Sequence, residues 1–189
     1  MPNMLQIDPK KASGATKEAF DEAARQFGGV INLFRVAGNA PNLLKGFLAL
    51  NGHLNDGAEL TGRQIELVAM LVSALNHCDY CVNVHMKVGM AQGATQNELL
   101  KALSAEADDA ETRALLEYTD AVVRNRGQVP APVLEMARAA GFSDKALLET
   151  IGVIGQYTLI QYVRHVADPD HDFPLVNEFD AVKHGAAFG

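Results

Sequence analysis

The stretch from Thr61 to Leu75 constrains the fold of this chain more than any other part of the sequence. Thr61-Gly62-Arg63-Gln64 indicates the start of a helix, and most of the residues that follow are apolar. The apolar positions are Ile65, Val68, Ala69, Leu71, Val72 and Leu75. A helix with so broad an apolar surface is buried on most of its sides. The sequence therefore predicts a helical core that contains this segment.

Helical spacing and helix-capping residues extend through the rest of the chain. A first helix is predicted from Thr16, as its cap, to Gly28, and Thr95 forms a capping box with Glu98. Further helices are predicted over residues 41–51, from about 77 to 89, 109–126, 130–139 and 143–166, with a partly apolar tail beyond residue 170 that packs across a neighbouring surface. Whether His77 begins a new helix or lies at a kink in a longer one is left open. No strand pattern is present, so we expect an all-α, single-domain protein with a lead-in and first helix over 1–28 and a helical domain over 29–189.

The size and charge of the chain exclude several classes of function. A chain of 189 residues with 48% hydrophobic residues can bury one substantial core. A net charge of −7 argues against nucleic-acid binding, which usually needs a basic face. The sequence has no apolar run long enough to span a membrane, and Met1 to Asp8 lack the pattern of a signal peptide. We expect a cytoplasmic protein that binds neither nucleic acid nor membrane.

Two cysteines follow the apolar helix, and they are the only ones in the sequence. Cys78 and Cys81 lie three residues apart, and His85 follows four residues later, so a helix places all three side chains on one side. In a reducing cytosol such a pair is more often catalytic, redox-active or metal-binding than a structural disulfide. Two alternatives stay open at this point: buried core thiols, and a zinc site in which Asp79 or His77 adds a fourth ligand.

Thiol chemistry needs a group that removes the proton from sulfur. A cysteine has a pKa of about 8.5, and only its thiolate attacks peroxide or disulfide sulfur. His85 can accept the proton, and a carboxylate can orient the imidazole. A helix that begins at the motif stabilises a thiolate most strongly at Cys78, whereas the shorter spacing to His85 favours Cys81. The residues alone therefore do not decide which sulfur is the nucleophile.

The segment from Glu66 to His85 resembles the signature of the alkylhydroperoxidase D-like branch of the carboxymuconolactone decarboxylase family. In that family a glutamate stands twelve residues before the first cysteine of a Cys-x-x-Cys-x-x-x-His motif, and Glu66, Cys78, Cys81 and His85 fit these positions. Segments 32–35, 39–41 and 172–174 also resemble the longer peroxidase-related members, so the resemblance covers most of the chain after about Gly29.

This resemblance implies a fold, an assembly and a reaction. The fold is an all-α helical bundle of the alkylhydroperoxidase D-like type, assembled as a homo-oligomer, either a trimer or a hexamer. The reaction is reduction of hydroperoxides or disulfides, with Cys81 as the peroxidatic thiol, Cys78 as the resolving thiol, and Glu66 and His85 as the proton relay. The position that is histidine in the best-known members is Tyr80 here, which titrates near pH 10 and is a poor proton carrier.

The function predicted from the sequence is a thiol-dependent peroxidase and disulfide oxidoreductase. Its substrate is a hydroperoxide, its partner is a thiol or dithiol reductant protein, and no cofactor or metal is expected. The alternatives are a zinc- or redox-responsive oligomeric module without significant turnover, and an enzyme of the carboxymuconolactone decarboxylase type. The decarboxylase branch lacks the cysteine pair, which disfavours the second alternative.

Overall fold

The computed structural model describes residues 2–173, and in this range the chain folds as helices without strands. A short 3-10 turn, Pro9–Lys11, precedes the first α-helix. The α-helices are α1 (Gly14–Phe27), α2 (Asn32–Ala37), α3 (Pro41–Asn55), α4 (Gly62–Leu75), α5 (Asp79–Ala91), α6 (Gln96–Ala102), α7 (Ala110–Arg124), α8 (Ala131–Ala139) and α9 (Asp144–Ala167). The predicted all-α fold is confirmed.

Helix α4 is the apolar segment that the sequence placed in the core, and it is buried as expected. Every residue from Gln64 to Ala74 is buried, and the helix packs against α5, α6, α7 and α9. One side of α4 contributes Val68 and Val72 to a large hydrophobic cluster, and the other contributes Met70 and Leu71 to a second cluster beneath α6. Two buried faces explain why the apolar run is nearly continuous.

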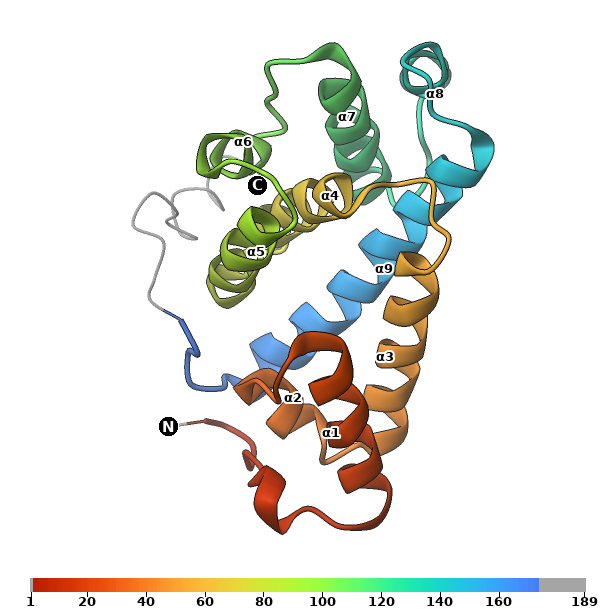
Figure 1. Ribbon diagram of the computed structural model, residues 1–189. Coiled ribbons are helices and arrows are strands. Elements are labelled where there is room, and N and C mark those ends of the chain that lie inside the picture. The colour runs from red at the N-terminus through yellow and green to blue at the C-terminus, as the bar shows by residue number, and fades with distance from the viewer. Residues whose placement is uncertain (1, 174–189) are drawn as a thin grey trace.

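Helix α9 crosses the molecule and joins its two halves (Figure 1). It packs against α2 and α3 on one side and against α4 and α7 on the other. Helix α1 packs on α3, and its Phe20 and Ala23 belong to the same large cluster as residues of α4 and α9. The first helix is therefore part of the main core.

The turn between α4 and α5 separates two helices. His77 has a φ of 54°, in the left-handed region, and the Cys78 backbone N–H donates to Ser73 O at 2.8 Å. Because a left-handed residue interrupts the helix, α5 starts afresh with Cys78 as its N-cap. The structure thus decides in favour of a new helix over a kink, and this places Cys78 at a helix terminus.

Several predicted boundaries hold and others are wrong. The capping box of Thr95 and Glu98 is present. Thr16 does not cap α1, because the helix already begins after Ser13 and the Thr16 hydroxyl donates to Gly38 O instead. Helix α2, which spacing did not reveal, is only six residues long.

The two ends of the described chain lie together. The backbone N–H of Asn3 donates to Ala167 O at 2.8 Å, and Gln6 bonds to Asp170. Residues 168–173 continue irregularly along this surface, as expected for the start of the tail, and the remainder of the tail lies outside the described residues. No helix in the described range has the length and apolar character needed to cross a membrane.

Candidate active site

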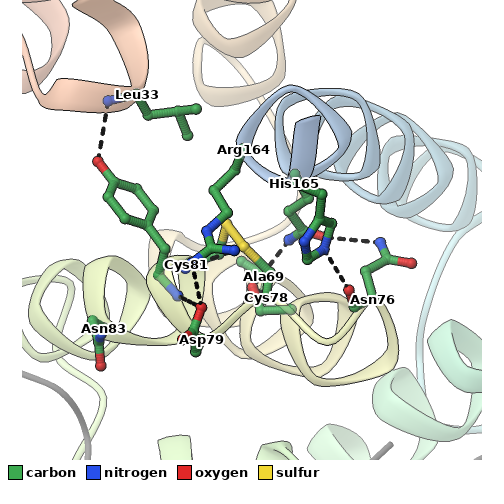
Figure 2. Close-up of a disulfide and its surroundings, with 12 residues drawn as sticks. Leu33, Ala69, Asn76, Cys78, Asp79, Cys81, Asn83, Arg164 and His165 are labelled. Atoms are coloured by element: carbon green, nitrogen blue, oxygen red, sulfur yellow. Dashed lines mark hydrogen bonds and ion pairs between the residues drawn. A yellow bond between two sulfur atoms is a disulfide. The ribbon is translucent and has the colours of Figure 1, made fainter. Parts of the chain in front are cut away.

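Helix α5 begins at the cysteine pair. Cys78 and Cys81 form a disulfide with their Cα atoms 5.2 Å apart (Figure 2), and both side chains are buried. Cys78 Sγ also accepts a hydrogen bond from the Cys81 backbone N–H at 3.3 Å, as an N-cap side chain does. A thiolate at Cys78 would receive this N–H and the positive end of the helix dipole. The local structure therefore suits Cys78 to carrying negative charge.

Glu66 and His85 meet in the interior between α4 and α5. Glu66 Oε2 lies 2.8 Å from His85 Nδ1, and the two residues are only 5% and 7% exposed. Arg63 pairs with Glu98 and not with Glu66. The Thr95 backbone N–H, and then Arg63, lower the pKa of Glu98 to about 2. The structure therefore brings together Glu66 and His85, the residues expected to form a relay, although their catalytic role stays a prediction.

A small apolar cavity opens beside this pair. Its volume is about 60 Å³, and Glu66, His85, Tyr80, Tyr157 and Cys81 contribute to its lining, whereas Cys78 does not. The remaining walls are apolar: Phe27, Ile31, Leu33, Phe34, Phe47, Val84, Val88 and Ile160. Cys81 and His85 thus line the same cavity, and Cys78 is not among its lining residues. The assignment of Cys81 as the nucleophile stays a prediction, and this lining is the observation that favours it.

Tyr80 forms a wall of the cavity and holds the tail. Its hydroxyl donates to Asp172 and accepts from the Leu33 backbone N–H at 3.3 Å. The Asp172 carboxylate in turn accepts from the Asn32 backbone N–H at 3.1 Å. Burial, and then the bond to Asp172, raise the pKa of Tyr80 far above its usual value. Tyr80 is therefore a structural residue that stays protonated.

The site includes two residues of the last helix, Tyr157 and Arg164, that the sequence did not point to. The Tyr157 ring packs edge-on against His85, with centroids 4.5 Å apart, and burial raises the Tyr157 pKa well above its usual value. Arg164 Nη2 lies 2.9 Å from Asp79 Oδ1 at the first turn of α5. Both α9 residues lie more than 70 positions after the motif and no local pattern marks them, whereas Asp172 lies in the 172–174 segment that resembles the longer peroxidase-related members.

Two of the alternatives for the cysteines can now be compared with the geometry. In the described range, no three histidine, cysteine, aspartate or glutamate side chains are arranged to hold a metal ion, so the zinc hypothesis finds no ligand set there. The cysteines are buried, but Cys81 faces a cavity beside a carboxylate–imidazole pair. That arrangement differs from two thiols that only fill a core.

The fold and the site define an all-helical dithiol protein with a carboxylate–imidazole pair next to one sulfur. Residues 41–125 match the model of the carboxymuconolactone decarboxylase family. This match covers a little under half of the chain, and the whole fold is similar to that of alkylhydroperoxidase D-like structures. No curated protein matches the sequence.

Three solved structures illustrate the shared fold. The AhpD-core, peroxidase-related protein from Ralstonia eutropha JMP134 has a TM-score of 0.77 at 19% identity, with 94% of this chain and 93% of that chain covered. The peroxidase-related protein from Silicibacter sp. TM1040 has a TM-score of 0.73 at 22% identity, with 90% and 92% covered. The debrominase Bmp8, as a cysteine-to-alanine variant with 2,3,4-tribromopyrrole, has a TM-score of 0.73 at 14% identity, and both chains are fully covered at 100%. At these identities the likeness establishes the fold alone.

Proposed function

We propose that the protein is a thiol-dependent peroxidase and disulfide oxidoreductase that cycles Cys78 and Cys81 between dithiol and disulfide. The observation that carries the proposal is the position of Cys81. It is bonded to Cys78, it faces an apolar cavity, and the buried Glu66–His85 pair lines the same cavity. The proposed nucleophile and proton acceptor thus line a space that a small molecule can occupy, and the proposed resolving thiol is bonded to the nucleophile.

The reaction follows from these positions. His85 accepts the proton of Cys81, and the thiolate attacks the outer oxygen of a hydroperoxide, so the O–O bond breaks and an S–O bond forms. The proton returns to the departing alkoxide, which leaves as an alcohol. The Cys78 thiolate then attacks the Cys81 sulfenic acid, the disulfide forms and water leaves. The dithiol supplies both electrons, and a thiol or dithiol reductant protein in the cytoplasm restores it.

The reduced protein is expected to lose both free thiols when one equivalent of an organic hydroperoxide is added. The expected products are one alcohol and one intramolecular disulfide for each chain, because the two electrons come from the Cys78–Cys81 pair. Thiol titration and mass spectrometry measure this, and a dithiol reductant should restore both thiols. Thiols that survive excess peroxide would contradict the proposal and favour the module without turnover.

Decarboxylase-type activity would survive replacement of both cysteines by serine, whereas the peroxidase activity would not.

A second candidate reaction is reductive dehalogenation of an aromatic compound. The apolar, phenylalanine-rich cavity beside Cys81 favours it, and the debrominase Bmp8 shares the fold. In this case sulfur takes the halogen from carbon, a proton replaces it on the ring, Cys78 displaces halide, and the disulfide forms. Incubation of the reduced protein with 2,3,4-tribromopyrrole distinguishes the two reactions: stoichiometric bromide release favours dehalogenation, and peroxide consumption alone favours the peroxidase.

We also propose that the chain forms a homo-oligomer, either a trimer or a hexamer. The outer face of α9 carries large apolar side chains that are exposed: Leu148 (67%), Ile151 (43%), Leu159 (42%), Tyr162 (59%) and Val166 (61%). Self-association would remove this apolar surface from water. Light scattering at micromolar concentration should give a multiple of the 20.3 kDa chain mass. A monomeric mass would contradict the proposal, and Tyr162→Glu should lower the mass where α9 forms the contact.

A further inference from the structure

Arg164 reaches from α9 to the start of α5, where the disulfide lies. Figure 2 shows its side chain among the surroundings of Cys78 and Cys81, with Asp79 below it. Arg164 Nη2 and Asp79 Oδ1 are 2.9 Å apart, and the Arg164 side chain is only 14% exposed. A guanidinium that is largely buried is costly unless it is paired, and Asp79 supplies the opposite charge here.

The pairing with Asp79 bears directly on Cys78. Asp79 follows Cys78 in the chain and begins α5, so its carboxylate lies at the helix terminus where a Cys78 thiolate would form. Like charges at close range disfavour ionisation, and Asp79 alone would therefore oppose the thiolate. The other charged groups near Arg164 and Asp79 are Asp168, 3.6 Å from Arg164, and His171, 3.9 Å from Asp79. Arg164 is the permanently charged cation of this group.

A second observation concerns the part of Arg164 that does not contact Asp79. Arg164 Nε is buried and, among residues 2–173, has no hydrogen-bond partner while the cysteines form a disulfide. A buried donor without a partner is unfavourable, and disulfide sulfur accepts hydrogen bonds only weakly. A thiolate is a stronger, negatively charged acceptor. The Arg164 Nε–H, which is unsatisfied in the oxidised protein, is thus available to a cysteine thiolate in the reduced protein.

We propose that Arg164 is a positioning residue that stabilises the Cys78 thiolate in the reduced protein. It cancels the charge of Asp79 next to Cys78, and its buried Nε–H is a donor that no described residue uses. Cys81 and Cys78 are then activated by different groups: the Glu66–His85 pair serves Cys81, and Arg164 with the α5 terminus serves Cys78. Stabilising this thiolate keeps Cys78 ready to attack oxidised Cys81 and shifts the redox equilibrium towards the dithiol.

The inference rests on the dithiol function proposed above, but its test needs no peroxide. In a Cys81→Ser background Cys78 is the only thiol, and the ultraviolet absorbance of its thiolate is followed against pH, with the variant lacking both cysteines subtracted. This readout does not depend on access of a reagent to a buried sulfur. Arg164→Gln should raise the titration midpoint by about one pH unit, a tenfold change in the thiolate–thiol equilibrium.

Two further variants separate an electrostatic role from a structural one. Arg164→Lys keeps the charge without Nε, so its midpoint should fall between those of the parent and Arg164→Gln. Asp79→Asn with Arg164 intact should lower the midpoint, and this arm holds even where Arg164→Gln does not fold. Equal midpoints for the parent, Arg164→Gln and Asp79→Asn would overturn the inference. A protein that shifts as expected but does not reduce peroxide would refute the proposed function and leave this inference standing.

Discussion

Replacing Cys81 with serine is expected to lower the peroxide turnover rate by at least about a thousandfold, equal to about 4 kcal/mol of transition-state stabilisation. Cys81 is the sulfur that faces the cavity beside His85, and serine places a far weaker nucleophile there. The measurement is the rate of organic hydroperoxide consumption with a dithiol reductant in excess. Serine is nearly isosteric with cysteine, so the fold should tolerate the change although Cys81 is only 3% exposed.

Cys78→Ser is the matched control, because it removes the other sulfur of the same pair. With Cys81 intact, this variant should consume one equivalent of peroxide and then stop, since no resolving thiol is present to form the disulfide. Mass spectrometry should find one added oxygen, the sulfenic acid or its further oxidation products. The reverse pattern, in which Cys78→Ser is inert and Cys81→Ser reacts once, would assign the nucleophile to Cys78 at the α5 terminus.

The sequence predicted the core of this fold because its signals are local. The apolar run that became α4, the Thr95–Glu98 capping box and the glycines after α1 each act within a few residues. Helix α2 escaped detection because six residues hold fewer than two turns, too few for a periodic pattern. Thr16 shows the opposite error, because a residue suited to capping bonds a distant carbonyl, Gly38 O.

The prediction of the candidate site has the same limit, because local spacing identified only the residues near one helix and tertiary contacts supplied the rest. Spacing on one helix placed Cys78, Cys81 and His85 on α5, but the contact of Glu66 with His85 depends on how α4 and α5 cross after the turn at His77. Only the resemblance to a family suggested that pair in advance. Arg164, Tyr157 and Asp172 reach the site through tertiary packing of α9 and the tail, so no pattern within the motif could have identified them.

Glu66→Gln is expected to lower the peroxidase rate by about a hundredfold, the smaller end of the usual contribution of a positioned acid or base. A carboxylate only accepts hydrogen bonds, so the Nδ1 of His85 carries the proton towards Glu66 and Nε2 is left as the proton acceptor. Glutamine keeps the size of the side chain and can keep a hydrogen bond. It removes the charge that stabilises the imidazolium formed when Cys81 gives up its proton. The measurement is the single-turnover oxidation rate of the reduced protein as a function of pH.

The control for this effect is His85→Gln, alone and combined with Glu66→Gln. Because the buried carboxylate and imidazole act as one unit, each single change should cost nearly as much as the double change. His85→Gln alone removes the imidazole N–H that Glu66 accepts, leaves the buried carboxylate less well satisfied, and should also lower the unfolding free energy, by about 1 to 3 kcal/mol. The double variant removes that buried charge and should recover stability without recovering rate. Recovered stability together with a wild-type rate would show that Glu66 and His85 support the core and take no part in proton transfer.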